Sequence, residues 1–576
     1  KRKCCIMRLF NFTVSNCRNC NKCVRECPVN AIRFLNNEAK ISETRCIACG
    51  RCFEACPQHA RNVQNDVDKV LNSIEYGKKV VAVLDSAYIG TFKEPAKFIA
   101  ALRELGFDSV LECAAASEKV TDLYIDYINK NAGKQKYFIS STCPATYIFI
   151  EKYHHDILKY LMPIASPMVL MGRVIKEKYP DCMAVYIGPC LSKKYETFPK
   201  EGAEVDAHIT FVEILKMFRK KEVVMNVMPP SVPDVVPAHS GQTYSISGDM
   251  WPSLTKTIEG NGYGVLRVSG MDKIKELFTS IENGTLENCY IGISACTESC
   301  INGPFIPWDA NGLFCRRQKI ESFAEKGGWG IKSEKIDWSN IDTSYQFETK
   351  DVPNKIPDEA EMREILSSMG RKTPADEFNC GACGYNTCRE KAVAVYNGMA
   401  SVETCWPNLQ EKARRIGDLF FRNSINILFL LDKNLKVLQI NPVGERKLGF
   451  RNEEAVGKPV DIFNAGHDIY QQALNIKNDI LNVKMRLRDK NLTVIANIVY
   501  IEGDEIFVLM QDITQEENRK AELAKLKMHT VETAQNVIEK QMSVAQEIAS
   551  LLGETTAETK VVLNRLKDVV LKEEGD

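Results

Sequence analysis

Cysteine is the residue type whose distribution points to chemistry in this sequence. The chain has 576 residues and 22 cysteines, which crowd into a few stretches, and none follows Cys405. Thiolates gathered at short spacings are the ligands that soft metal ions and iron-sulfur clusters prefer. The first residues lack a long apolar stretch and a small-residue cleavage site, so we expect a cytoplasmic protein whose thiols stay reduced. The clustering therefore predicts metal ligation, with disulfide pairing as the minor interpretation.

Two runs near the N-terminus share one spacing. Each reads Cys-x-x-Cys-x-x-Cys-x-x-x-Cys-Pro, first in residues 17–28 and again in residues 46–57. In such a pair, three thiolates of a run hold one 4Fe-4S cluster, and the fourth, before proline, crosses to the other cluster. Two zinc ribbons are the alternative, but these need paired Cys-x-x-Cys units. We expect set A to be Cys17, Cys20, Cys23 and Cys56, and set B to be Cys46, Cys49, Cys52 and Cys27.

Four more cysteines lie in three short segments in the middle of the chain. The segments are SSTCP (140–144), GPCLSKKYE (188–196) and ACTESCING (295–303). Four thiolates on separated loops are enough for one buried cubane cluster. Lys193 follows one of these cysteines by three residues and could place an ammonium over anionic groups. This central set consists of Cys143, Cys190, Cys296 and Cys300.

The three segments resemble the signature motifs of the FeFe (iron-only) hydrogenase catalytic domain, and the resemblance runs from about residue 1 to residue 330. It implies that the central set binds the cubane of an H-cluster. Cys300 would also link this cubane to a di-iron subcluster with CO, cyanide and azadithiolate ligands. Lys193 would hydrogen-bond one cyanide and the backbone N-H of Ala87 the other, while the protein keeps the site dry. The implied partners are H2, protons, a ferredoxin-like electron carrier and the hydrogenase maturation proteins.

Several positions depart from the motifs of catalytic relatives. Thr142 stands where those proteins have a cysteine that hands protons to the bridgehead amine, and a hydroxyl does not titrate near ~8.5 as a thiol does. Gly188 and Ser294 replace two methionines, which should open space and add a hydroxyl near the diatomic ligands. The stretch before the first motif offers only Asp122 and Asp126 for a proton path. These replacements resemble the sensory branch of the family and predict slow turnover.

A further group of cysteines, set C, follows at residues 380–405. The segment CGACGYNTC, with one more cysteine after a helix-like stretch, resembles a small 4Fe-4S domain of other redox proteins. Zinc is the alternative, because four cysteines alone do not name the metal. Set C consists of Cys380, Cys383, Cys388 and Cys405. Six cysteines receive no chemistry, since free thiols are common packing residues, and these are Cys4, Cys5, Cys113, Cys182, Cys289 and Cys315.

The elements that must position the central ligands are alternating strands and helices. VVAVLDSAYIG, from residue 80, predicts a buried strand that ends in a loop, and FKEPAKFIAALRELG predicts the helix after it. YFISSTCPA and AVYIGPCLS repeat the strand and loop. We therefore expect an α/β region in which the cysteines follow the strands.

The cysteine-free C-terminal region has a different pattern. INILFLLDKNLKVLQINPVGERKLGF, with NLTVIANIVYI and DEIFVLMQDIT, resembles a PAS domain within residues 424–514. The last helix predicts a coiled coil, and hence a homodimer, that hands a signal to a separate kinase or phosphatase. Its seam residues recur at steps of three and four, and they are Leu523, Leu526, Val537, Val544, Ile548 and Leu551.

The predicted fold class is multidomain α/β, and the division of the chain follows the composition. We expect a ferredoxin-like domain with two 4Fe-4S clusters (1–76), the FeFe-hydrogenase α/β domain (77–332), a linker (333–375), a 4Fe-4S domain (376–410), a PAS-like α+β domain with its leading helix (411–517) and a C-terminal coiled-coil helix (518–576).

Bulk properties exclude two classes of partner. Lys and Arg together number 75, as do Asp and Glu, so no net field favours nucleic acid. The apolar runs are shorter than the roughly 20 residues that cross a bilayer, so we expect no membrane span. The resulting hypothesis is a slow hydrogenase that reports its redox state to a sensory tail. The alternatives are a ferredoxin-linked catalytic hydrogenase and a non-catalytic iron-sulfur scaffold without the di-iron unit.

Overall fold

The computed structural model divides the chain into two compact units, residues 1–409 and residues 410–576, and each is considered by itself. It describes residues 10–12, 16–35, 38–197, 203–237, 241–247, 252–331, 336–463, 466–552 and 562–568. Cys4 and Cys5 lie outside these ranges.

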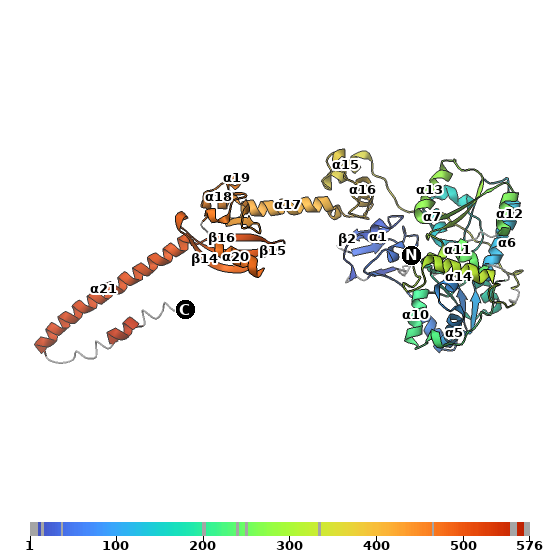
Figure 1. The fold of residues 1–576 in the computed structure, drawn as a ribbon, viewed down its shortest axis with the longest axis horizontal. Coiled ribbons are helices and arrows are strands. Elements are labelled where there is room, and N and C mark those ends of the chain that lie inside the picture. Colours follow the sequence, from blue (N-terminus) through green and yellow to red (C-terminus); the bar gives the residue numbers. More distant parts are fainter. Residues whose placement is uncertain are drawn as a thin grey trace, which may run out of the picture. The chain divides into compact units, whose positions relative to one another are not determined.

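The first unit contains a four-stranded sheet in the order β6-β5-β8-β9, with every neighbouring pair parallel. Figure 1 draws this unit in colours that run from blue through green to yellow along the sequence. Its strands are β5 (Val80–Leu84), β6 (Ser109–Glu112), β8 (Met183–Gly188) and β9 (Ala207–Thr210). All residues of β5 and β8 are buried, because helices cover both faces of a parallel sheet. One core cluster includes residues of α5 (Pro95–Leu105) and α10 (Phe211–Lys220). The opposite core cluster includes residues of α6 (Ala114–Asn131) and α8 (Pro167–Lys178).

A second parallel sheet has the order β10-β11-β7. Its strands are β7 (Tyr137–Ile139), β10 (Gly264–Ser269) and β11 (Cys289–Ser294). Its core includes side chains of α7 (Pro144–Tyr153) and α13 (Met271–Glu282). The predicted α/β region with strands at all three quoted segments is therefore confirmed.

The N-terminal part repeats one small motif. The two cysteine runs form the short helices α1 (Lys22–Arg25) and α2 (Arg51–Glu54). Asn19 and Ala48, which are 29 residues apart, both have positive φ, and the pairs Asn21 with Gly50 and Asn30 with His59 repeat this conformation at the same separation. Two antiparallel ladders complete the part: β1 (Phe10–Phe12) with β4 (Arg61–Val63), and β2 (Ile32–Leu35) with β3 (Glu38–Ile41). The ferredoxin-like expectation is confirmed at this level.

The stretch that we expect to be a linker, residues 333–375, contains a helix. Helix α15 (Glu359–Ser368) forms there, with a capping box between Asp358 and Glu361, and contacts α16 (Cys388–Tyr396). The stretch before it is anchored, since Lys350 Nζ lies 2.5 Å from Glu151 Oε2. The polar, proline-dotted sequence gave no sign of these contacts, because they join residues far apart in the chain. Its role as a linker between domains stays a prediction.

The second unit is built on a five-stranded antiparallel sheet in the order β13-β12-β16-β15-β14. Its helices are α18 (Pro442–Leu448), α19 (Asn452–Ala455) and α20 (His467–Ile476). Buried Asn441 caps α18 and also accepts a hydrogen bond from the backbone of Leu428. The strands are β12 (Ile427–Leu431), β13 (Val437–Ile440), β14 (Ile480–Leu487), β15 (Leu492–Ile501) and β16 (Glu505–Asp512). The first quoted segment forms β12, β13 and α18, the other two form β15 and β16, and β14 lies outside the quoted segments.

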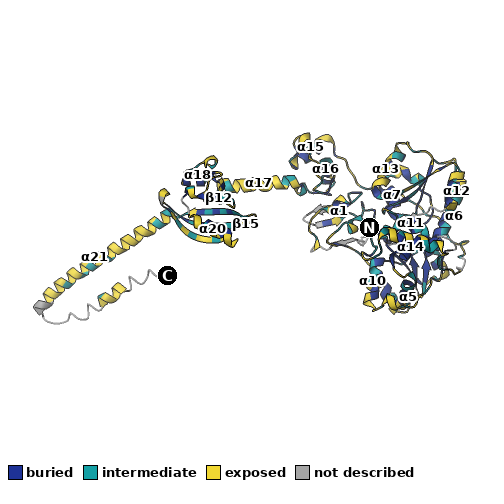
Figure 2. Cartoon of the chain, in the orientation of Figure 1, coloured by how far each residue is buried: buried dark blue, intermediate teal, exposed yellow. Residues whose placement is uncertain are grey.

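Two helices flank this sheet in sequence, α17 (Trp406–Asn423) and α21 (Thr514–Leu552). Figure 2 shows that both are largely exposed in a single chain. Five of the six seam residues of α21 are half-exposed, from Leu523 at 50% to Leu526 at 65%, and the side chain of Leu551 is not described. Pairing into a coiled coil thus stays a prediction. None of the helices in the described part of the chain is both long and apolar enough to cross a bilayer.

Candidate metal centres

The central ligands come together because each follows the carboxyl end of a parallel strand. Cys143 follows β7, Cys190 follows β8, and Cys296 and Cys300 follow β11. In open α/β sheets such loops form the binding crevice. Cys143 lies at the cap position of α7, and Pro144 supplies the first helical residue, as helix starts favour. Three segments distant in sequence thereby reach one place.

The loops line one pocket. Cys143, Cys190 and Cys300 line it, together with Thr142 and Lys193. Cys296 does not line this pocket, but its pKa is raised by burial and then by the thiolates of Cys190, Cys143 and Cys300, so it belongs to the same group. The central set is thus one constellation in space.

Burial also raises the pKa of Cys190 and Cys300. A buried thiolate is unfavourable unless positive charge offsets it, and metal binding requires the deprotonated form. Iron would supply that charge, so the residues fit a cluster. Within the described ranges, no three Cys, His, Asp or Glu side chains close on one point as a single ion would need.

Lys193 is held by two partners that the sequence did not reveal. Its Nζ lies 3.3 Å from Asp85 Oδ2 and 2.5 Å from the Tyr186 hydroxyl, and that hydroxyl also donates to Asp85. Although burial lowers its pKa, Asp85 and the nearby thiolates of Cys113 and Cys300 raise the Lys193 pKa above the usual range. Lys193 is thus fixed in position at the pocket, and its placement over anionic groups of a bound cluster stays a prediction.

The structure bears on two predicted effects of the motif changes, which are added space at Gly188 and an added hydroxyl at Ser294. Gly188 does not open space: an added Cβ would lie 2.7 Å from Tyr186 Cε1 and 2.9 Å from Asp85 Cβ, so these side chains fill the volume. Ser294 does line the pocket, but its hydroxyl lies 3.3 Å from the Cys296 carbonyl and from Ser299 Oγ. The prediction that the missing methionine opens space is wrong at Gly188, because the side chains of Tyr186 and Asp85 occupy that space.

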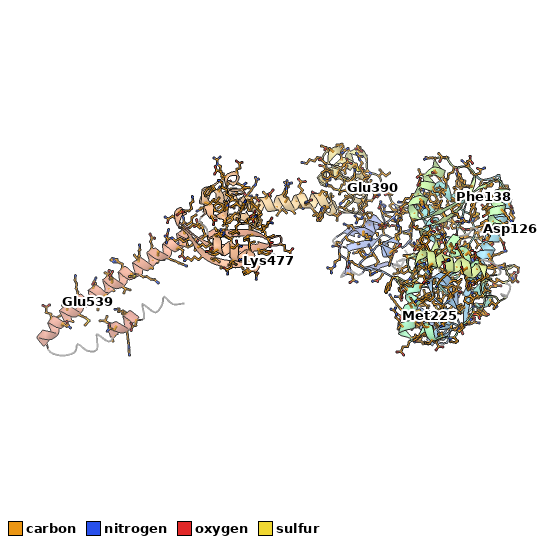
Figure 3. All side chains as sticks on the ribbon, viewed as in Figure 1. Asp126, Phe138, Met225, Glu390, Lys477 and Glu539 are labelled. Carbon is orange, nitrogen blue, oxygen red and sulfur yellow. The ribbon has the colours of Figure 1, made fainter. Side chains whose placement is uncertain are left out.

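The other predicted donors are engaged or remote. The backbone N-H of Ala87 donates to Asp85 Oδ1 at 3.0 Å, so donation to a ligand would require this bond to be exchanged. Asp122 and Asp126 are exposed on α6 and do not line the pocket, and Figure 3 shows Asp126 at the outer edge of this part. Cys113, to which we assigned no chemistry, does line the pocket and is buried.

Sets A and B show backbone amides aimed at sulfur. The N-H of Asn19 lies 3.4 Å from Cys17 Sγ, and that of Ala48 lies 3.3 Å from Cys46 Sγ. A positive φ is costly for alanine, so Ala48 is strained where it serves a thiol. Burial and the neighbouring Cys27 raise the pKa of Cys46 to about 12. Cys27 thus lies beside the second run, as the crossed pairing requires.

Comparison with known proteins agrees with this geometry. Residues 78–304 match the family model described as iron only hydrogenase large subunit, C-terminal domain. This part of the chain is hydrogenase-like. Residues 10–57 match the 4Fe-4S dicluster domain, and residues 376–407 match an Fe-S cluster model.

Curated relatives are distant. A cytosolic Fe-S cluster assembly factor of Danio rerio is 23% identical over 37% of this chain and 66% of its own length. The factor of the same description from Kluyveromyces lactis is 30% identical over 16% of this chain and 19% of its own length. The chain therefore spans less than two thirds of these relatives.

Solved structures are also distant in sequence. An FeFe-hydrogenase of Chlamydomonas reinhardtii is 14% identical, with a TM-score of 0.38, and covers 50% of this chain and 100% of its own. A PAS domain from Haloarcula marismortui is 21% identical, with a TM-score of 0.16, and covers 18% of this chain and 99% of its own.

Set C lies outside the hydrogenase-like domain and has a separate pocket of about 370 Å³ lined by its four cysteines. Two buried cations adjoin it: Arg371 Nη2 lies 3.5 Å from Cys405 Sγ, and Lys391 Nζ donates to Thr404 Oγ1 at 2.9 Å. Positive charge and amide donors around thiolates suit an anionic iron-sulfur cluster. Four cysteines separated by a helix are thus brought to one site.

A buried carboxylate near the pocket was also missed. Glu112 is fully buried, and Tyr88 and Trp329 donate to its Oε1 while Gln242 donates to its Oε2. The sequence signal was weak, because a lone Glu at the end of an apolar strand does not reveal three donors from other elements.

Proposed function

We propose that the chain is a hydrogen-responsive protein of the FeFe-hydrogenase type that splits H2 slowly and reports its redox state. The observation that carries the proposal is the pocket that three thiols of the central set line together with Lys193. A pocket with this donor set fits an H-cluster, with Cys143, Cys190, Cys296 and Cys300 on the cubane and Cys300 shared with the di-iron unit. When bound, that group supplies the heterolytic cleavage of hydrogen.

The protein's own contribution is position, charge and dryness. Asp85 and Tyr186 hold the ammonium of Lys193 where a cyanide would need a donor. The side chains of Asp85 and Lys193 are 6% and 9% exposed, so water is kept from the pair. Such fixed donors around a metal centre tune its affinity and potential.

Slow turnover follows from the proton-handling residues. Thr142 lines the pocket where a titrating thiol would be needed, and neither Asp122 nor Asp126 reaches it. A proton relay works best with a group whose pKa lies near the working pH. Slow chemistry suits a reporter, and the PAS-like unit with α21 would receive the signal, dimerise and act on a kinase or phosphatase in the cytoplasm.

Turnover of the matured protein tests this proposal. Hydrogen uptake with a ferredoxin-type acceptor should be slow, while hydrogen should still change the infrared bands of CO and cyanide. Rates as fast as those of catalytic hydrogenases would favour a ferredoxin-linked enzyme instead.

A non-catalytic iron-sulfur scaffold is the second candidate, because the curated relatives are described as cytosolic Fe-S cluster assembly factors. The two candidates differ in the di-iron unit. Coexpression with the maturation proteins should add two irons per chain beyond the cubanes in a hydrogenase, and none in a scaffold. Lys193, paired in the pocket, favours the first candidate.

A further inference from the structure

We infer that set B is a junction: it faces the central set on one side and set C on the other, and Gly384 and Tyr385 dock set C onto it beside Cys27. The inference deepens the proposed function, because it names the route by which the redox state leaves the hydrogenase-like domain. Loaded with 4Fe-4S clusters, each set accepts and returns one electron, and no atom is transferred. The electrons originate from H2, which leaves two protons.

The backbone of set C approaches the ferredoxin-like domain closely at Gly384. A Cβ on Gly384 would lie 2.8 Å from Val24 Cγ1 and 3.4 Å from the Asn21 carbonyl oxygen. Its φ of +94° also favours glycine. Val24 lies on α1, between two cysteines of the first run. Only a residue without a side chain permits this contact.

The Tyr385 ring packs in a cluster that includes cysteines of both domains. Tyr385 is 4% exposed, and the cluster contains Val24 and Cys383 together with Cys27 and Cys52 of set B and Cys23 of set A. Two of these three ferredoxin-like cysteines belong to set B. This aromatic side chain therefore joins set C to the part of the ferredoxin-like domain that holds set B.

Set B also faces the hydrogenase-like domain. Cys49 and Cys296 line the same cavity. Cys46 and Cys143 pack against one apolar core. The two sides of set B thus contact different domains.

Two tethers hold set C in this position. The guanidinium of Arg45, next to Cys46, donates to the Pro353 carbonyl and lies 3.4 Å from Asn354 Oδ1. Asn397, after α16, exchanges hydrogen bonds of 2.9 and 2.8 Å with the backbone of Lys355. Residues 353–355 are thereby hydrogen-bonded both to the ferredoxin-like domain and to the domain that holds set C.

Set A is left for an outside carrier. Cys20 of set A is exposed, whereas the other three cysteines of set A, like all four of set B, are intermediate. Electron transfer falls steeply with distance, so a soluble carrier would approach set A at Cys20. The arrangement separates exchange with a carrier from signalling to the C-terminal unit.

The test uses the full chain reconstituted with iron and sulfide and reduced by dithionite, so it needs no hydrogen chemistry. Pulsed EPR measures how reduced set B speeds the spin relaxation of reduced set C. Gly384→Ala should weaken this enhancement several-fold, because the new methyl group meets Val24. Gly398→Ala is the matched control: Gly398 has a φ of +67° on the same domain, but nothing lies within 4 Å of an added Cβ.

Tyr385→Phe guards against a trivial folding defect, since it keeps the ring and should keep the enhancement. Iron content and circular dichroism establish that each variant is loaded and folded. Unchanged relaxation in loaded Gly384→Ala would overturn the inference, as would coupling of set C to set A or to the central cubane instead of set B. Loss of the hydrogen response alone would leave this result standing and count against the proposed function.

Discussion

Lys193 and Asp85 form a buried ion pair, with Nζ and Oδ2 3.3 Å apart, at the wall of a pocket that four cysteines also line. Parallel pairing of β5 with β8 sets their proximity, since Leu84 lies opposite Ile187 and the next residue of each strand opens the site. The pair explains how an ammonium can be kept in a dry, sulfur-lined pocket. Replacement of either Lys193 or Asp85 should therefore disturb the pocket.

Asp85→Asn should destabilise the apoprotein by about 3 kcal/mol, because it leaves the Lys193 charge buried without its carboxylate. Thermal unfolding of the apoprotein checks this value. Asp68→Asn is the control: its ion pair with Lys220 is exposed and should contribute less than about 1 kcal/mol. Equal effects of the two substitutions would show that the buried pair has no special role.

Thr142→Cys should raise the turnover of the matured protein, by roughly tenfold to a hundredfold if proton transfer limits the rate. A thiol at this place in the pocket can give and take a proton, which the hydroxyl does not. Hydrogen evolution from a reduced viologen measures it. Thr142→Ser should bring no gain, and a rise in both variants would point to a change in packing instead.

Glu112→Gln tests the buried carboxylate by pH. Burial raises the pKa of Glu112 above its usual 4.5, although hydrogen bonds from Tyr88, Trp329 and Gln242 oppose the rise. A group with a raised pKa in the folded state contributes stability at low pH and loses it as pH rises through that pKa. The melting temperature of Glu112→Gln minus that of the native protein should therefore increase from pH 4.5 upward.

Glu75→Gln should show the opposite pH dependence of the difference in melting temperature between variant and native protein. Glu75 is exposed, and Lys221 lowers its pKa, so its small contribution is present above 4.5 and fades below. A pH profile of Glu112→Gln parallel to that of Glu75→Gln would contradict the burial argument.

Arg61→Met should lower the reduction potential of the cluster on set A. Arg61 is buried, and its Nη2 lies 3.0 Å from Cys23 Sγ, so its charge favours the reduced, more negative cluster. Redox titration followed by EPR measures the shift. Arg33→Met removes an exposed charge from the same domain and should leave the potential nearly unchanged.

The sequence predicted the features that depend on residues close together in the chain. Cys17 to Cys27 and Cys46 to Cys56 are local runs, and the strands before Cys143 and Cys190 are apolar enough to be recognised. The sequence did not reveal the roles of Asp85, Tyr186 and Cys113, because only the register of β5 against its neighbours brings them to the pocket. Helix α15 was not predicted, because its apolar face, with Met362 and Leu366, is narrow and packs on a helix further along the chain.

The most direct test is infrared absorption of the matured protein in the region of CO and cyanide stretching. The account predicts these bands in the native protein and in Cys315→Ser, which removes an exposed thiol, and their loss in Cys300→Ser. Absence of the bands from the native protein after maturation, or their full retention in Cys300→Ser, would contradict it.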